Sequence, residues 1–319
     1  MSKLTLIDLA KRSGNEPTIG IVESRSQLNA FFTLAPVKPI DGSMYKYQRR
    51  TSLPTVGFRD LNGGVTPQKS VIQDVIVECK DMLGVSEVDK SLADRAKEGA
   101  IAFRQKEDAG FLSAMANTFN SKAYYGNSAT TAAEIDGVGR VLSTLGGTCI
   151  SATGSGAGVQ SSMYFWSFSD AIGVSGRIPG VEIPIANGLL PSAQDLGVTM
   201  AFQTGSTTAK YPVYTTIFEF KPGLAIYDSR SVGRLANITS SAKPTIELIN
   251  SVITAMMPFQ CDLITCSKTV YNYVQALKGT TGFDQNPQTG LEIFKRARFF
   301  DGIPILVDES ITHTEAVVS

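Results

Sequence analysis

A proline-free stretch from Ser86 to Phe119 constrains the fold of this chain more than any other feature. Its apolar residues recur at helical spacing, Ser86 is a favourable N-cap, and two acidic residues follow in the first turn. Gly99 and Gly110 weaken the prediction, each costing about 1 kcal/mol relative to alanine. One helix of this length would be on the order of 50 Å long, so we expect it to brace an extended subunit. An ordinary long core helix is the alternative that periodicity leaves open.

The composition limits the class of protein. The chain has 319 residues, 43% of them hydrophobic, which suffices for one large domain or two small ones. Lys plus Arg and Asp plus Glu number 29 each, so the formal net charge is zero. Sequence-specific nucleic-acid binding is disfavoured because it usually requires a basic excess. A neutral shell that encloses a polyanion remains compatible with this balance.

The cysteines and the apolar runs bear on the compartment. Cys79, Cys149, Cys261 and Cys266 are dispersed among apolar residues, as expected for reduced thiols, and their spacing does not favour zinc. The first residues lack the pattern of a signal peptide. No apolar run approaches the roughly 20 residues that span a membrane. We therefore expect a soluble protein that is not secreted by a standard route.

The segment before the long helix divides into an arm and a ribbon. Short helices are expected at 5–11 and 17–32, and prolines then force an extended exit, so residues 1–40 read as a jointed arm. Strands at Met44–Arg50 and Val71–Cys79 flank a turn-rich tip. A two-stranded ribbon is only marginally stable alone and needs a surface to lie on. A hairpin packed on its own domain is the alternative. The ribbon carries a local basic excess, from Lys46, Arg49, Arg50, Arg59 and Lys69.

After the long helix the pattern becomes mainly β. A short segment is expected at 135–145, and strands are expected at 163–168, 198–203, 213–220 and 224–228, with 228–238 leaving the sheet. Helices are predicted at Thr245–Met257 and from Ser267 to Lys278, around a short strand at 262–266. A closing antiparallel pair is predicted at 293–299 and 303–308, joined at Asp301-Gly302. The tail, 310–319, would add a strand or stay free.

Residues with catalytic potential are few. The chain has one histidine, His313, in a tail that we expect to be mobile. The Gly154–Gly158 run lacks the Gly-Lys-Ser/Thr ending of a phosphate-binding loop, so a linker is the better interpretation. No paired metal-ligand spacing occurs. We predict no catalytic, cofactor-binding or metal-binding residues, and hence no enzyme.

The order of arm, basic ribbon, long helix, β-rich part and returning strand resembles the major capsid proteins of tailed bacteriophages, of the short-tailed type. Local stretches resemble that family at Gly42–Tyr47, at Tyr214–Asn237 and at Phe299–Ile305. The resemblance covers nearly the whole chain and implies the α+β, Hong Kong 97-like capsid fold. It implies a division into an N-terminal arm (1–40), an extended β-hairpin loop (41–80), a peripheral domain with the spine helix (81–145), an axial domain of mixed β structure with two helices (146–290) and return strands of the peripheral domain (291–319).

The resemblance also implies a function. Pentamers and hexamers would form an icosahedral shell around the double-stranded DNA of a tailed phage. The protein would be made in the host cytoplasm and reside in the virion. Its main partner would be itself, with scaffolding, portal and cement proteins as possible partners, DNA contacted non-specifically, and no membrane. An encapsulin-like nanocompartment is an alternative within the fold, and a small enzyme built around the Gly-rich loop is the alternative from another class.

The resemblance suggests contacts between copies. The ribbon of one subunit would lie over its neighbour, where its basic residues would meet acidic ones such as Glu98, Glu107 or Asp108. Some relatives join loop lysines to asparagines by isopeptide bonds. Lys46 and Lys69 are loop lysines here, but no matching partner or catalytic carboxylate is evident, so we expect no such crosslink.

Overall fold

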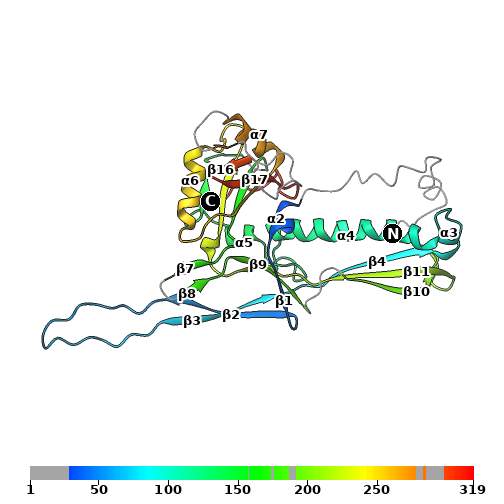
Figure 1. Ribbon diagram of the computed structural model, residues 1–319, viewed down its shortest axis with the longest axis horizontal. Coiled ribbons are helices and arrows are strands. Elements are labelled where there is room, and N and C mark those ends of the chain that lie inside the picture. Colours follow the sequence, from blue (N-terminus) through cyan, green and yellow to red (C-terminus); the bar gives the residue numbers. More distant parts are fainter. Residues whose placement is uncertain (1–28, 157, 174–175, 187–191, 278–282, 285–297) are drawn as a thin grey trace.

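The computed structural model describes residues 29–156, 158–173, 176–186, 192–277, 283–284 and 298–319. The molecule is elongated around helix α4 (Ala100–Tyr125). A three-stranded sheet runs beside α4, a larger sheet with two helices stands at one end of it, and a two-stranded ribbon projects away from that end (Figure 1). The arm helices predicted before residue 29 lie outside the described residues.

The prediction of one helix from Ser86 to Phe119 is wrong for residues 86–99 and right from Ala100 onward. Residues Met82–Asp89 form strand β4, Lys90–Asp94 form the short helix α3, and α4 starts only after Gly99, whose φ is +87°. Asp89, not Ser86, caps the first helix, by accepting a hydrogen bond from the Ser91 N–H at 2.8 Å. The 26 residues of α4 make a helix of about 39 Å, still the longest in the described chain.

Long-range pairing explains why Ser86 lies in a strand. β4 pairs antiparallel with β11 (Lys210–Phe220), more than 100 residues later in the chain. Along β4 the side chains of Ser86 and Val88 are buried whereas Val85 and Glu87 are exposed, which is the period of a strand. Tertiary pairing of this kind overrides local helix signals.

The three-stranded sheet has the order β10-β11-β4, with β10 at Ser192–Phe202. It is antiparallel throughout, with an irregularity between Asp195 and Gly197. Phe218 of β11 stacks on Phe111 of α4 with ring centroids 5.3 Å apart. A Cβ at Gly84 would lie 3.2 Å from the Phe111 ring, so glycine allows this close packing. The sheet and α4 therefore pack together as one elongated unit, which we call the rod.

The larger sheet has seven strands. Their order is β15 (Phe283–Asp284), β16 (Arg298–Phe300), β17 (Ile303–Val307), β14 (Leu263–Cys266), β6 (Ser161–Trp166), β13 (Val232–Ile238) and β5 (Cys149–Ser151). The expectation that residues 228–238 leave the sheet is wrong, since β13 pairs with both β6 and β5. Two polar residues of β13, Arg234 and Asn237, are buried because the C-terminal tail supplies partners for them.

Helix α6 (Ile246–Met256) packs against this sheet, and α7 (Lys268–Ala276) contacts β6 and β17. Thr245 and Ser267 cap these helices by accepting hydrogen bonds from Leu248 N–H and Val270 N–H, which confirms both predicted helix starts. The closing pair at Asp301-Gly302 is confirmed by β16 and β17, while the predicted positions 293–297 lie outside the described residues. The remaining elements are α2 (Ala30–Leu34), β1 (Val37–Ile40), α5 (Val138–Val141), β7 (Ala171–Gly173), β8 (Gly176–Ile178), β9 (Val181–Ala186), β12 (Ala225–Ile226) and the 3₁₀ turn Ser229–Ser231.

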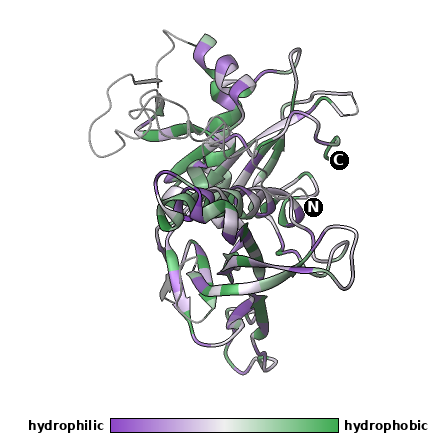
Figure 2. Cartoon of the chain, turned by 90° about the vertical axis from the view of Figure 1, so that its right-hand side faces the viewer, coloured by the Kyte–Doolittle hydropathy of each residue, from purple (hydrophilic) through white to green (hydrophobic). Residues whose placement is uncertain are grey.

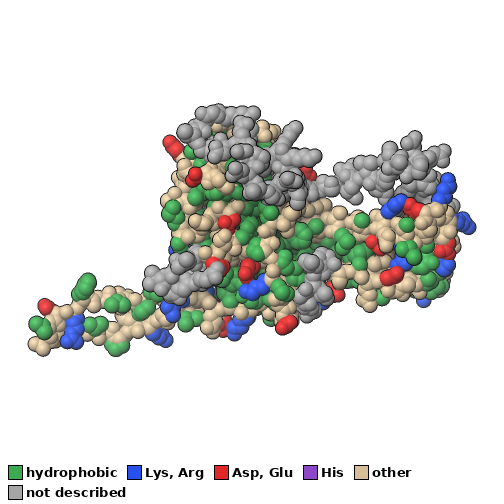
Figure 3. Space-filling view, viewed as in Figure 1, with side chains coloured by type: hydrophobic (Ala, Val, Ile, Leu, Met, Phe, Trp, Pro, Cys, Tyr) green, Lys and Arg blue, Asp and Glu red, His purple; other side chains and the backbone are tan. Residues whose placement is uncertain are grey.

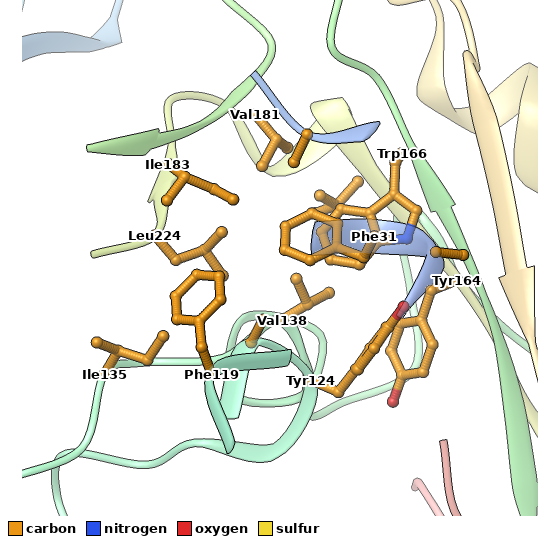
Figure 4. Packing of buried hydrophobic residues seen from close by; sticks show 14 of the residues in the cluster. Phe31, Phe119, Tyr124, Ile135, Val138, Tyr164, Trp166, Val181, Ile183 and Leu224 are labelled. Atoms are coloured by element: carbon orange, nitrogen blue, oxygen red, sulfur yellow. The ribbon is translucent and has the colours of Figure 1, made fainter. Parts of the chain in front are cut away.

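The main core lies where α4 crosses beneath the seven-stranded sheet. Phe31 of α2 stacks on Trp166 at 4.1 Å between centroids and also contacts Tyr124 (Figure 4). Phe32 contacts Phe119 of α4 and Phe220 of β11. Hydrophobic residues concentrate on the strands and on the helix surfaces that face them (Figure 2). The short helix α2 thereby joins the rod to the seven-stranded sheet.

The C-terminal tail is neither free nor a strand. Glu315 forms an ion pair with Arg234 of β13 at 2.8 Å, and both side chains are nearly inaccessible to solvent. Tyr125 and Ser162 also donate hydrogen bonds to Glu315. The expectation of a mobile tail is therefore wrong for residues 310–319, because a buried ion pair fixes it across the sheet.

Two segments pair differently from the domain division that the resemblance implied. β10 and β11, expected in the axial part, pair with β4 beside α4. β16 and β17, expected as return strands of the peripheral part, belong to the seven-stranded sheet. The domain boundaries themselves stay a prediction. The four cysteines are free and buried, as expected for reduced thiols.

Candidate assembly interface

The ribbon predicted at 41–80 is present and stands away from its own subunit (Figure 1). It consists of β2 (Met44–Ser52) and β3 (Val71–Glu78), which pair antiparallel from Met44↔Glu78 to Ser52↔Val71. From Gln48 to Asp74 every side chain is exposed, apart from the half-buried Gly63 and Ser70. The alternative of a hairpin packed on its own domain is therefore wrong for all but the base of the ribbon.

Much of this exposed surface is apolar (Figure 3). Phe58 is fully exposed and Leu61 is 92% exposed, which is unusual for large hydrophobic side chains in a lone soluble subunit. The exposed apolar residues of the ribbon are Met44, Leu53, Val56, Phe58, Leu61, Val65, Val71, Ile72 and Ile76. The sequence analysis singled out only the charges here. The sequence did contain a signal for them. These apolar residues occur in a Pro- and Gly-rich segment, where no helix or strand could bury them.

The predicted basic residues all lie on the ribbon. Lys46 forms an ion pair with Asp74 of the opposite strand at 2.8 Å, and hydrogen bonds from Lys46 and Gln48 lower the pKa of Asp74. Arg49 and Arg50 are exposed on β2. Arg59 and Lys69 are exposed in the tip, where blue side chains gather in Figure 3.

The predicted acidic residues lie at the other end of the molecule. Glu98 precedes α4 and forms an ion pair with Lys106 of its own subunit. Glu107 and Asp108 are half-buried in the first half of α4. Burial raises the pKa of Asp108, partly offset by a hydrogen bond from Ser86 and by the charge of Arg104. The Oδ1 atom of Asp108 accepts no hydrogen bond from the described residues.

The structure does not bring the basic and acidic groups together within one subunit. The ribbon tip and the start of α4 are at opposite ends of the elongated molecule (Figure 1). Contact between Arg59 or Lys69 and Glu107 or Asp108 therefore requires two copies. Such a contact joins different surfaces of the two copies, which is a head-to-tail arrangement, and it forms a ring when the rotation between copies closes.

A second exposed apolar surface lies around the three-stranded sheet. Its edge strands, β4 and β10, expose Leu83, Val85, Leu196, Val198, Met200 and Phe202, and α4 exposes Ile101 and Leu112. An exposed edge strand presents unpaired backbone groups that favour pairing with another chain. Nearby, Arg104 forms an ion pair with Asp195 at 2.6 Å and lies over the Tyr214 ring at 4.8 Å. The Arg104 hydrogen bond and charge lower the pKa of Asp195.

The other candidate sites have structural partners. Gly154 donates its N–H to the Asn237 carbonyl at 3.0 Å, and a Cβ there would lie 2.3 Å from that carbonyl oxygen. The Gln160 side chain donates to the Gly156 carbonyl. His313 lies 3.5 Å from the Ser267 hydroxyl. Within the described ranges, no group of three His, Cys, Asp or Glu side chains could hold a metal ion. Likewise, none of the described helices combines the length and hydrophobicity needed to cross a membrane.

Comparisons with known proteins agree with this geometry. The family model for the major capsid protein GP7 matches residues 13–319. The chain is similar to the bacteriophage Epsilon15 structure, with a TM-score of 0.73 and 21% identity over 100% of this chain and 98% of that one. It is similar to the bacteriophage JBD30 capsid, with a TM-score of 0.50 and 11% identity over 92% of this chain and 96% of that one. A search of curated protein sequences found no match.

An encapsulin from Synechococcus elongatus PCC 7942 aligns with a TM-score of only 0.44, at 11% identity over 76% of this chain and 99% of that one, which is too low to support the encapsulin alternative. The likeness to the two phage structures establishes the Hong Kong 97-like fold that the sequence predicted. The family model establishes more, because it covers almost the whole chain, including the ribbon, the rod and the seven-stranded sheet. The chain belongs to the major capsid protein GP7 family and is a structural protein of the phage capsid, assembled from many copies of itself.

Proposed function

We propose that pentamers and hexamers of this chain build an icosahedral shell around the double-stranded DNA of a tailed phage. The observation that carries the proposal is the ribbon, whose apolar residues have no cover within their own subunit. A neutral subunit suits this role, because net self-repulsion would oppose dense association. The protein acts in the virion as a structural component without catalytic activity.

The contact we propose is between the ribbon of one subunit and the rod of the next. The tip residues Phe58 and Leu61 would pack against the edge strands β4 and β10 or the exposed residues of α4. Burying a large apolar side chain stabilises by about 1.5–3 kcal/mol. Several such residues per ribbon would offset the cost of ordering it. Because each subunit both gives and receives a ribbon, the contact repeats around a closed ring.

Charge would set the register of this contact. Arg59 and Lys69 would approach Glu107 and Asp108 of the neighbour, as the sequence analysis expected. Exposed ion pairs contribute only about 0–1 kcal/mol each, so they would favour the correct alignment more than they increase affinity. Glu98 and Lys46 form ion pairs within their own subunit, which would reduce their contribution to this contact.

Other partners follow from the role of a shell. We propose that DNA is contacted non-specifically, and that scaffolding, portal and cement proteins can bind the shell. Synthesis would take place in the host cytoplasm. We propose no isopeptide bond at Lys46 or Lys69. The division into arm, extended loop, peripheral and axial domains is kept as part of this proposal, with β10 and β11 assigned to the peripheral part and β16 and β17 to the axial part.

The test is a change at Phe58, which touches no core of its own subunit. We expect Phe58→Asp to leave the thermal unfolding of isolated subunits unchanged, because the side chain is already exposed. We expect it to reduce the yield of shells at least tenfold, measured by sedimentation and electron microscopy. The conservative variant Phe58→Leu is the matched control and should still assemble. Shells formed by Phe58→Asp at the wild-type yield would contradict the proposed contact.

A further inference from the structure

The ribbon is attached to its subunit through a small polar and aromatic cluster. Tyr45 and Tyr47 lie on the same face of β2, and this face lies over the three-stranded sheet β1-β9-β12. Lys38 of β1, Glu182 of β9 and Tyr227, which follows β12, meet them there. We call these five residues the base clamp.

Hydrogen bonds join four members of the base clamp, and the fifth, Tyr47, contacts the Tyr45 and Tyr227 rings. The Lys38 ammonium donates to the Tyr45 hydroxyl at 2.9 Å, to the Tyr227 hydroxyl at 3.2 Å and to Glu182 Oε2 at 3.2 Å. Tyr227 bonds to Tyr45 at 2.9 Å and donates to Glu182. The Tyr47 hydroxyl donates to the Ile226 carbonyl at 3.0 Å. Lys38 also lies 4.8 Å from the centre of the Tyr45 ring. Directional bonds of this kind select one geometry, unlike apolar packing alone.

The second strand of the ribbon is held at the same level. Val75 and Val77 pair with Tyr47 and Tyr45, so they share the inner face. Cys79 is buried next to Gly223, where an added Cβ would lie 3.2 Å from the Cys79 sulfur. The Lys80 N–H donates to the Pro222 carbonyl at 3.1 Å. Between Tyr47 and Val75 the residues of the ribbon are exposed, apart from the half-buried Gly63 and Ser70.

This arrangement makes the base a pivot with a long arm. About 15 residues separate Tyr47 from the tip, which is about 50 Å of extended chain. A rotation of about 10° at the base would move the tip by about 9 Å, more than the diameter of an aromatic ring. The position of Phe58 on a neighbouring subunit therefore depends on the angle at the base.

We propose that the base clamp is a positioning device that fixes the ribbon angle and thereby the uniformity of shell size. The inference rests on the proposed assembly function. Bonding to Tyr45 and Glu182 raises the pKa of Lys38, and burial raises the pKa of Tyr227. Both groups therefore keep one protonation state near neutral pH, and so does the network that they form.

The test removes hydroxyl groups and keeps the rings. The double variant Tyr45→Phe with Tyr227→Phe loses the two tyrosine bonds to Lys38 and the Tyr227 bond to Glu182, but leaves the ribbon tip and its docking surface intact. We expect it to assemble with at least a twofold broader distribution of particle diameters, or with several shell sizes, by cryo-electron microscopy. We also expect faster hydrogen exchange at residues 44–47 and 75–80. Tyr273→Phe is the control, since it removes a hydroxyl from α7, outside the base clamp, the ribbon and the proposed docking surface, and it should give uniform shells.

The outcomes separate the two proposals. Shells from the double variant as uniform as those of the wild type would overturn the base clamp and leave the assembly function standing. Failure of the wild type and of Tyr273→Phe to form any shells would instead overturn the assembly function. If the double variant does not fold, the single variant Tyr45→Phe decides by the same criterion, because Tyr45 is only half-buried.

Discussion

At the scale of single residues, buried carboxylates join parts of the chain that lie far apart in sequence. Asp308 is fully buried and accepts hydrogen bonds from Asn120 at 2.7 Å, from Tyr124 at 3.1 Å, and from the backbone of Phe31 and Ser310. These donors come from α2, α4 and the C-terminal tail. One carboxylate thus holds the crossing of the rod and the seven-stranded sheet, and Glu315 does the same for the tail.

Asp308→Asn should destabilise the subunit by about 1–3 kcal/mol at pH 7. An amide has one acceptor oxygen, so its NH₂ group would face the Phe31 N–H or the Asn120 amide, and a buried donor would lose its partner. Denaturant unfolding of unassembled subunits measures this directly. Equal stability of the two proteins would contradict the assigned network.

The same variant should have a distinct pH dependence. Burial raises the pKa of Asp308 above its ordinary value of 3.8, so the folded chain holds this proton to higher pH than the unfolded chain. The stability that protonated Asp308 contributes is fully present below the ordinary pKa. It is lost as the pH rises through the raised pKa of the folded chain. The stability advantage of the wild type over Asp308→Asn should therefore shrink as the pH rises from the ordinary pKa to the raised pKa of Asp308. Above the raised pKa the advantage should stay constant. An advantage that grows with pH there would be inconsistent with a raised pKa.

At the scale of elements, the sequence predicts what local pattern determines. The ribbon strands, the helix start at Thr245, the cap at Ser267 and the Asp301-Gly302 turn depend on neighbours within a few residues, and each is confirmed. β4 and β13 were not predicted, because their partners are distant in sequence. Ser86 is a good helix cap in isolation, and only pairing with β11 makes it a strand residue.

The residues of the candidate interface were also predicted only in part. The basic residues of the ribbon can be found by counting charges along residues 41–80. Which acidic residues they meet depends on where a second copy lies. The exposed apolar residues of the tip required knowing that nothing in the subunit covers them. Local sequence gave no indication of the base clamp, since Lys38, Tyr45, Glu182 and Tyr227 meet only in the folded chain.

A change within α4 tests the rod. Gly110 lies in the middle of the helix, and a Cβ there would have no heavy atom within 4 Å. Gly110→Ala should stabilise unassembled subunits by about 0.5–1 kcal/mol through helix propensity. Gly99→Ala is the contrasting variant, and it should destabilise because φ at Gly99 is +87°. Thermal unfolding of both variants gives the comparison, and a loss of stability in Gly110→Ala would argue against an uninterrupted α4.

At the scale of the whole molecule, the subunit is long and has uncovered apolar surfaces at both ends (Figures 1 and 3). The ribbon tip exposes Phe58 and Leu61 at one end, and the edge strand β10 exposes Met200 and Phe202 toward the other. In a monomer these apolar surfaces stay in contact with water, so they add nothing to its stability. In a closed assembly the ribbon of one subunit can cover the rod of the next, and the reverse holds on the other side. The apolar surfaces of a subunit are therefore covered only when it has neighbours.

A cryo-electron microscopy reconstruction of the assembled shell tests this claim most directly. The account predicts that residues 53–70 of every ribbon contact an adjoining subunit. It predicts that Phe58 is buried against the sheet β10-β11-β4 or the helix α4 of that adjoining subunit. A shell in which Phe58 and Leu61 stay in solvent, or touch only their own subunit, would contradict it.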